Sequence, residues 1–98
     1  MELRDKVTVI TGGASGIGAA SCRAFAAEGA RVVVADRDGD GAHRVADEIG
    51  GHAVACDVRQ EKNIQTLVEE TRRTYGPVDV FFSNAGLIGT GGDLRAEE

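Results

Sequence analysis

The chain has little of several features that mark particular classes of protein. Its 98 residues include two cysteines without C-x-x-C spacing, so we expect reduced, buried thiols rather than a disulfide framework or a metal site. No apolar run approaches the roughly 20 residues that span a bilayer, so no membrane partner is expected. The 11 lysines and arginines are scattered among 16 acidic residues, which argues against a nucleic-acid-binding surface.

The N-terminus also lacks the features of a signal peptide. Residues 1–6 are charged and lead directly into an apolar segment, which favours a cytoplasmic location. The chain is 42% hydrophobic and 28% charged, which is ordinary for a globular protein. Its length suffices for a buried core and allows one domain at most, so we take residues 1–98 together as all or part of one domain.

Apolar segments and glycines predict an alternation of strands and helices. The expected strands cover residues 6–11, 31–36, 52–56 and 78–83, and the expected helices cover residues 16–28, 41–49 and 60–75. The strands are almost continuously apolar, as in a sheet that is covered on both faces. The sequence therefore predicts an α/β fold, a partial Rossmann-type doubly wound parallel sheet with strand order 3-2-1-4, followed by a mobile loop over 87–98.

Helical periodicity also predicts which side of each helix faces the sheet. The expected buried residues are Ile17, Ala20, Ala24 and Phe25 in the first helix; Ala42, Val45, Ala46 and Ile49 in the second; and Ile64, Leu67, Val68 and Thr71 in the third.

The glycine-rich segment between the first strand and the first helix is the main functional signal. Gly12, Gly16 and Gly18 have the spacing G-x3-G-x-G. They suit a tight turn, a close approach of main chain to phosphate, and close packing of helix on strand, respectively. Ser15 adds a hydroxyl donor. The alternative is a glycine-rich turn that binds no ligand.

Asp36, at the end of the second expected strand, indicates which dinucleotide the turn would bind. Its carboxylate can accept charge-assisted hydrogen bonds from the adenosine ribose hydroxyls and would repel a 2′-phosphate. NAD is therefore the expected cofactor, with NADP less favoured. Arg37 offers a cation beside the acid, or is simply a solvated loop arginine.

Four segments together resemble the short-chain dehydrogenase/reductase family: T-G-G-A-S-G-I-G at 11–18, Asp36, Asp57-Val58 and Asn84-Ala85-Gly86. The resemblance implies that Asp57 accepts from the adenine 6-amino group, with support from the Val58 backbone. It also implies that residues 84–86 pass beside the adenosine ribose. Asp57 as a helix N-cap and Asn84 as a plain turn residue are the structural alternatives. The full candidate cofactor-binding set is Gly12, Ser15, Gly16, Ile17, Gly18, Asp36, Arg37, Cys56, Asp57, Val58, Asn84, Ala85 and Gly86.

No catalytic residue can be assigned from the sequence. The family resemblance implies a Ser, a Tyr-x-x-x-Lys pair and an Asn in a later half of the protein, which we expect to be missing from this chain. The only tyrosine, Tyr75, is followed by Gly76-Pro77-Val78-Asp79 and is expected to pack in the core. The acids at 36, 38 and 40 resemble a calcium loop, but a strand precedes them where that loop needs a helix, so no metal site is expected.

The resulting hypothesis is the NAD-binding portion of an oxidoreductase that acts on a small alcohol or ketone. A non-catalytic NAD-binding module and an S-adenosylmethionine-dependent methyltransferase are the alternatives. The apolar segment 78–82 would form an open sheet edge, so we expect a homo-oligomer or association with the missing half.

Overall fold

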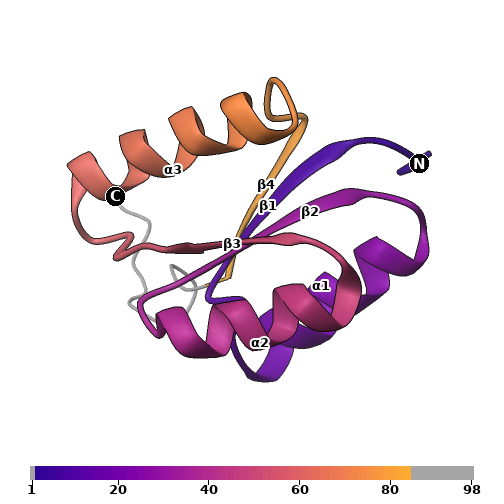
Figure 1. The fold of residues 1–98 in the computed structure, drawn as a ribbon, viewed down its shortest axis with the longest axis horizontal. Coiled ribbons are helices and arrows are strands. Elements are labelled where there is room, and N and C mark those ends of the chain that lie inside the picture. Colours follow the sequence, from indigo (N-terminus) through magenta and orange to yellow (C-terminus); the bar gives the residue numbers. More distant parts are fainter. Residues whose placement is uncertain (1, 85–98) are drawn as a thin grey trace, which may run out of the picture.

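The computed structural model describes residues 2–84, and these form a four-stranded parallel sheet with helices on both faces (Figure 1). The strands are β1 (Val7–Thr11), β2 (Arg31–Asp36), β3 (His52–Ala55) and β4 (Val80–Ser83), and the helices are α1 (Gly16–Ala27), α2 (Gly39–Ile49) and α3 (Glu61–Thr74). The strand order is β3-β2-β1-β4. The predicted fold class and strand order are confirmed.

The two faces of the sheet carry separate hydrophobic clusters. Successive strand residues point to opposite faces, so Ile10 and Val34 pack with α1 and α2, whereas Val9 and Val33 pack with Leu67 of α3. Figure 1 shows α1 and α2 together on one side of the sheet and α3 on the other. Because the four strands are parallel, they all end at the same edge of the sheet, where the connections from β1, β2 and β3 to the next helices begin. Among the described residues, no helix is both long and apolar enough to cross a membrane.

Local hydrogen bonds explain where the second helix begins and ends. Asp38 caps α2, because its side chain accepts from the Gly41 amide at 3.0 Å, and the helix starts two residues earlier than the sequence predicts. Gly50 ends the helix with a left-handed φ of 70°. The buried face predicted for α2 is confirmed at Ala42, Val45 and Ala46.

The buried face predicted for α1 is wrong at Ile17, Ala20 and Ala24, which are exposed, whereas Phe25 is partly buried and packs against the core cluster as predicted. The residues of α1 that are buried are Gly18, Ala19 and Cys22, and Ile17 is 71% exposed. The physical reason is the close approach of α1 to the turn before it, where Gly18 and Ala19 fit and the larger Ile17 does not. Periodicity favoured positions 17, 20 and 24 and missed positions 18, 19 and 22. In α3, Leu67 and Thr71 are buried as predicted, but Val68 is 38% exposed.

Candidate functional site

The candidate site lies at the carboxyl ends of the strands, where ligands bind in open parallel sheets. The turn after β1 is at its centre, because β1 has β2 on one side and β4 on the other. Two direct contacts join the neighbours to this turn. The Asp36 carboxylate at the end of β2 accepts from the Ala14 amide at 3.0 Å, and the Asn84 side-chain amide after β4 donates to the Gly12 carbonyl at 3.5 Å.

Three of the four glycines in the glycine turn, residues 12–18, have different structural functions. Gly18 allows close packing, because a Cβ there would lie 1.8 Å from the Gly12 carbonyl oxygen. Gly16 has a left-handed φ of 61° and faces open space, since a Cβ there would meet no atom within 4 Å. Sequence reasoning did not single out Gly13, whose added Cβ would lie 2.8 Å from Val34 Cγ1. The absence of a side chain at Gly13 allows the turn to pack directly against β2. In the sequence, only the Gly12-Gly13 pair indicated that such a close contact could occur here.

The first turn of α1 has the properties of an anion-binding helix N-terminus. It contains no acidic residue that would offset the partial positive charge of its free amides. Ser15 is the N-cap in an extended conformation, and its side chain makes no capping hydrogen bond. The exposed hydroxyl is therefore available to a ligand. Ile17 stands beside it as an exposed apolar side chain.

Asp36 has a structural function that the sequence did not reveal. Its Oδ2 accepts from the Ala14 amide at 3.0 Å, and its Oδ1 accepts from the Asp38 amide at 2.9 Å. Each carboxylate oxygen has two lone pairs, so one acceptor position remains on each oxygen. Asp36 thus uses one acceptor position on the glycine turn and one on the connection between β2 and α2, and leaves one position on each oxygen for a ligand.

The β3–α3 turn, residues 57–63, is organised by side chains. Oδ1 of Asp57 accepts from the Arg59 backbone amide at 3.0 Å and from Arg59 Nε at 3.1 Å, and Oδ2 accepts from Arg59 Nη2 at 3.0 Å. Asn63 Oδ1 accepts from the Asp57 amide at 3.1 Å. The N-cap of α3 is Gln60, so the helix-capping alternative for Asp57 is wrong. Sequence reasoning missed both Arg59 and Asn63.

Arg59 also controls the charge of Asp57. Its side-chain and backbone hydrogen bonds, with a smaller contribution from the charge of nearby Arg37, lower the pKa of the Asp57 carboxyl to about 2. Arg37 is exposed, in the connection between β2 and α2. Val58 is partly buried and packs against the α3-side cluster.

A cysteine lies next to each turn, Cys22 next to the glycine turn and Cys56 next to the β3–α3 turn. Both are free and buried, in agreement with the prediction of reduced, buried thiols. Cys22 Sγ lies 4.0 Å from the Gly13 carbonyl oxygen, and Cys56 Sγ lies 3.6 Å from the Asn63 carbonyl oxygen. Burial raises the pKa of Cys22 to about 11, and burial together with the Asp57 charge raises the pKa of Cys56. Both are therefore neutral thiols, and the Cys56 side chain is a packing group rather than a surface one.

The remaining predicted positions are partly outside the structure. Asn84 is 8% exposed and braces the glycine turn. Ala85, Gly86 and the loop expected at 87–98 lie outside the described residues. Tyr75 is the C-cap of α3 and packs against the α3-side cluster, in agreement with the prediction of a packing role.

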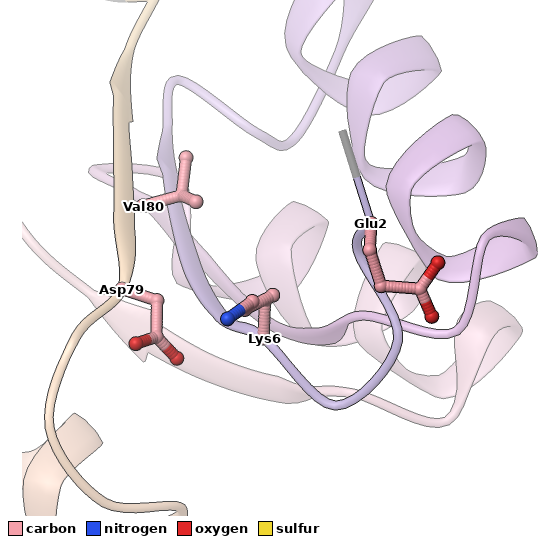
Figure 2. Close-up of a pocket in the computed structure, with 4 residues that line it drawn as sticks. All are labelled: Glu2, Lys6, Asp79 and Val80. Atoms are coloured by element: carbon pink, nitrogen blue, oxygen red, sulfur yellow. The ribbon is translucent and has the colours of Figure 1, made fainter.

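A hollow of about 430 Å³ lies at the opposite edge of the sheet and belongs to neither turn. Figure 2 shows its lining residues, Glu2, Lys6, Asp79 and Val80, near the starts of β1 and β4. The Asp79 carboxylate already accepts from the Val7 amide at 2.8 Å. This hollow is therefore a feature of the strand beginnings. Across residues 2–84, no cluster of three or more His, Cys, Asp or Glu side chains could hold a metal ion.

Comparisons with known proteins agree with this arrangement. A family model described as short chain dehydrogenase matches residues 6–98. The uncharacterized oxidoreductase YuxG of Bacillus subtilis is 45% identical over 93 residues, which cover 88% of this chain and 14% of that protein. A crystal structure of 3-ketoacyl-(acyl-carrier-protein) reductase from Brucella melitensis, complexed with NADH, is similar with a TM-score of 0.78 and 44% identity, and covers 80% of this chain and 33% of that one.

A second structure from the same organism has a different activity in its name. Ribose-5-phosphate isomerase from Brucella melitensis is similar with a TM-score of 0.82 and 39% identity, over 87% of this chain and 33% of that one. The chain spans about a third or less of the length of these relatives. A shared fold does not by itself assign an activity, so the function is argued from the site.

Proposed function

The chain belongs to the short-chain dehydrogenase family, and on that premise we propose that it is the NAD-binding portion of an oxidoreductase. The reaction is hydride transfer between the nicotinamide cofactor and a small alcohol or ketone. The substrate and the whole protein's activity are inferred, because the chain covers only part of its relatives. The neighbouring reductase whose structure holds NADH supports the class of cofactor.

The single observation that carries the proposal is the contact between Asp36 and the glycine turn. One carboxylate orders the Ala14 amide and keeps a free acceptor position on each oxygen. The residues present therefore fit a dinucleotide. Amides of residues 12–18 and the Ser15 hydroxyl would hold the diphosphate, and the space beside Gly16 would admit it. Asp36 would hold the adenosine ribose.

The preference for NAD over NADP follows from the same carboxylate. Two ribose hydroxyls can donate to the free acceptor positions of Asp36, whereas a 2′-phosphate would meet its negative charge. Arg37 lies beyond the acid and does not replace it. A bound cofactor would accept or donate the hydride, and the described residues would bind and orient the cofactor. We assign none of residues 2–84 to the proton transfer that accompanies hydride transfer.

Two alternatives stay distinct from this proposal. A non-catalytic module would bind NAD without turning over any alcohol or ketone. A methyltransferase is an alternative because such enzymes also use a glycine turn and an acid on the ribose. It would bind S-adenosylmethionine in preference to NAD.

Calorimetric titration of the protein at its full natural length, with NAD, NADP and S-adenosylmethionine, separates these possibilities. We expect NAD to bind at least about tenfold more tightly than NADP, the difference of one or two charge-assisted hydrogen bonds. Turnover of a panel of alcohols and ketones separates the enzyme from the module. Tighter binding of S-adenosylmethionine, or no binding of NAD, overturns the proposal.

A matched pair of variants locates the site. Gly16→Ala and Gly50→Ala both place a side chain at a left-handed φ facing open space, at 61° and 70°. Backbone strain should cost each variant a similar ~1–2 kcal/mol of folding free energy. Only Gly16→Ala puts a methyl group where the diphosphate would lie, so we expect it to lower NAD affinity about tenfold or more. Equal affinities in the two variants would place the cofactor elsewhere.

A further inference from the structure

The hydrogen bonds around Asp57 leave one acceptor position on its carboxylate. Oδ1 accepts two N–H groups, both from Arg59, and is saturated. Oδ2 accepts one, from Arg59 Nη2, and has one lone pair left. The planar guanidinium fixes this arrangement, because two parallel N–H groups on one carboxylate set both the rotation and the tilt of the acid.

We propose that Arg59 is a positioning residue for adenine: it turns the Asp57 carboxylate so that the free acceptor of Oδ2 meets the 6-amino group. The inference rests on the proposed dinucleotide function. Arg59 acts through Asp57, and it selects a base that donates a hydrogen bond over one that presents an oxygen.

Exposure indicates that the pair does more for recognition than for folding. The Arg59 side chain is 71% exposed and the Asp57 side chain is 20% exposed, so the arginine lies on the solvent side of the acid. Ion pairs of this kind contribute little to stability. We therefore expect the Arg59–Asp57 pair to affect ligand binding by the Asp57 carboxylate more than it affects folding.

The main chain of the turn has its own support. Asn63 Oδ1 holds the Asp57 amide, and the Gln60 amide donates to the Asp57 carbonyl at 3.0 Å. Removal of the Arg59 side chain therefore leaves the turn in place and leaves the Asp57 carboxylate with one of its three donors, the Arg59 backbone amide, about which the carboxylate can turn. The low pKa of Asp57 agrees with a carboxylate that remains an acceptor at neutral pH.

The test compares NAD with nicotinamide hypoxanthine dinucleotide, which has a carbonyl oxygen in place of the adenine 6-amino group. Binding of both is measured calorimetrically on the protein at its full natural length. We expect the unsubstituted protein to prefer NAD about tenfold or more, the effect of one charge-assisted hydrogen bond. Arg59→Ala should reduce this preference to about twofold, and Asp57→Ala should abolish it.

Two control variants separate geometry from charge. Arg59→Lys keeps the positive charge but lacks the planar guanidinium and its parallel N–H groups. We therefore expect this variant to lose most of the preference for NAD over the hypoxanthine dinucleotide. Arg73→Ala removes an exposed positive charge from the last turn of α3, outside the candidate cofactor-binding set, so the preference of this variant for NAD should stay unchanged.

Each other result overturns the inference. Equal loss of affinity for both dinucleotides in Arg59→Ala means a structural role, and full preference in Arg59→Lys means that charge alone acts. An unsubstituted protein that binds NAD without preference refutes the positioning role and leaves the cofactor proposal standing. An unsubstituted protein that binds neither dinucleotide refutes both.

Discussion

The glycine turn and the β3–α3 turn lie at the same edge of the sheet and are built in different ways. The glycine turn includes main-chain contacts so close that a side chain is excluded, as at Gly18, and the side chains of Asp36 and Asn84, which belong to other segments, bond to it. The β3–α3 turn is held by the side chains of Asp57, Arg59 and Asn63. The glycine turn therefore has positions, such as Gly18, that tolerate no side chain, whereas the β3–α3 turn has side chains that can be removed singly. The free energies of unfolding of single variants test this contrast.

The largest effect is expected at Gly18. In Gly18→Ala the new Cβ would lie 1.8 Å from the Gly12 carbonyl oxygen, so α1 must move away from the turn. We expect a loss of about 3 kcal/mol or more in the free energy of unfolding, measured by urea denaturation. Gly39→Ala is the control, because its Cβ would meet only Ala55 Cβ at 3.3 Å. A similar loss in both variants would contradict the main-chain explanation.

The second effect is expected at Asp36, the side chain that completes the glycine turn. Asp36→Ala leaves the Ala14 and Asp38 amides without their acceptor, and we expect a loss of about 2 kcal/mol in the free energy of unfolding. Asp47→Ala, in the exposed part of α2, should change the stability by less than about 0.5 kcal/mol. An equal effect of the two substitutions would mean that Asp36 does not order the turn.

A smaller effect is expected in the β3–α3 turn. Asn63→Ala removes the acceptor of the Asp57 amide, but this part-buried group can turn to water. We expect a loss of about 1 kcal/mol in the same denaturation experiment. A loss as large as that of Gly18→Ala would show that the two turns are equally intolerant and would end the contrast.

The smallest effect concerns the thiol below the glycine turn. Because the pKa of Cys22 is about 11 in the folded protein and 9.0 in its ordinary state, the folded protein keeps the proton longer. The resulting stabilisation is complete below pH 9 and is lost as the pH rises towards 11. At pH 9.5 we expect the loss to be below about 1 kcal/mol. Urea denaturation between pH 8 and pH 9.5 should therefore show a shallower decline for Cys22→Ala, and an identical decline would contradict the shift.

Reading the sequence succeeded where one segment carried the whole signal. The apolar strands predicted the β3-β2-β1-β4 order, and Gly12, Gly16 and Gly18 predicted the turn, because backbone conformation and burial leave a local pattern. It failed for the inner face of α1. Helical periodicity predicted Ile17 as a core residue, but Ile17 is exposed. The close approach of α1 to the glycine turn favours small side chains, and helical periodicity carries no information about that distance.

Residue type and order alone specify the alternation of strands and helices, the glycine turn, an acid at the end of β2 and an acid after β3. What Asp36 and Asp57 do depends on how the folded chain places them. Asp36 reaches Ala14 across 22 residues of sequence, and the free acceptor of Asp57 depends on the orientation of the Arg59 fork. The physical reason is that a hydrogen bond depends on distance and direction in space, whereas the sequence records only residue type and order.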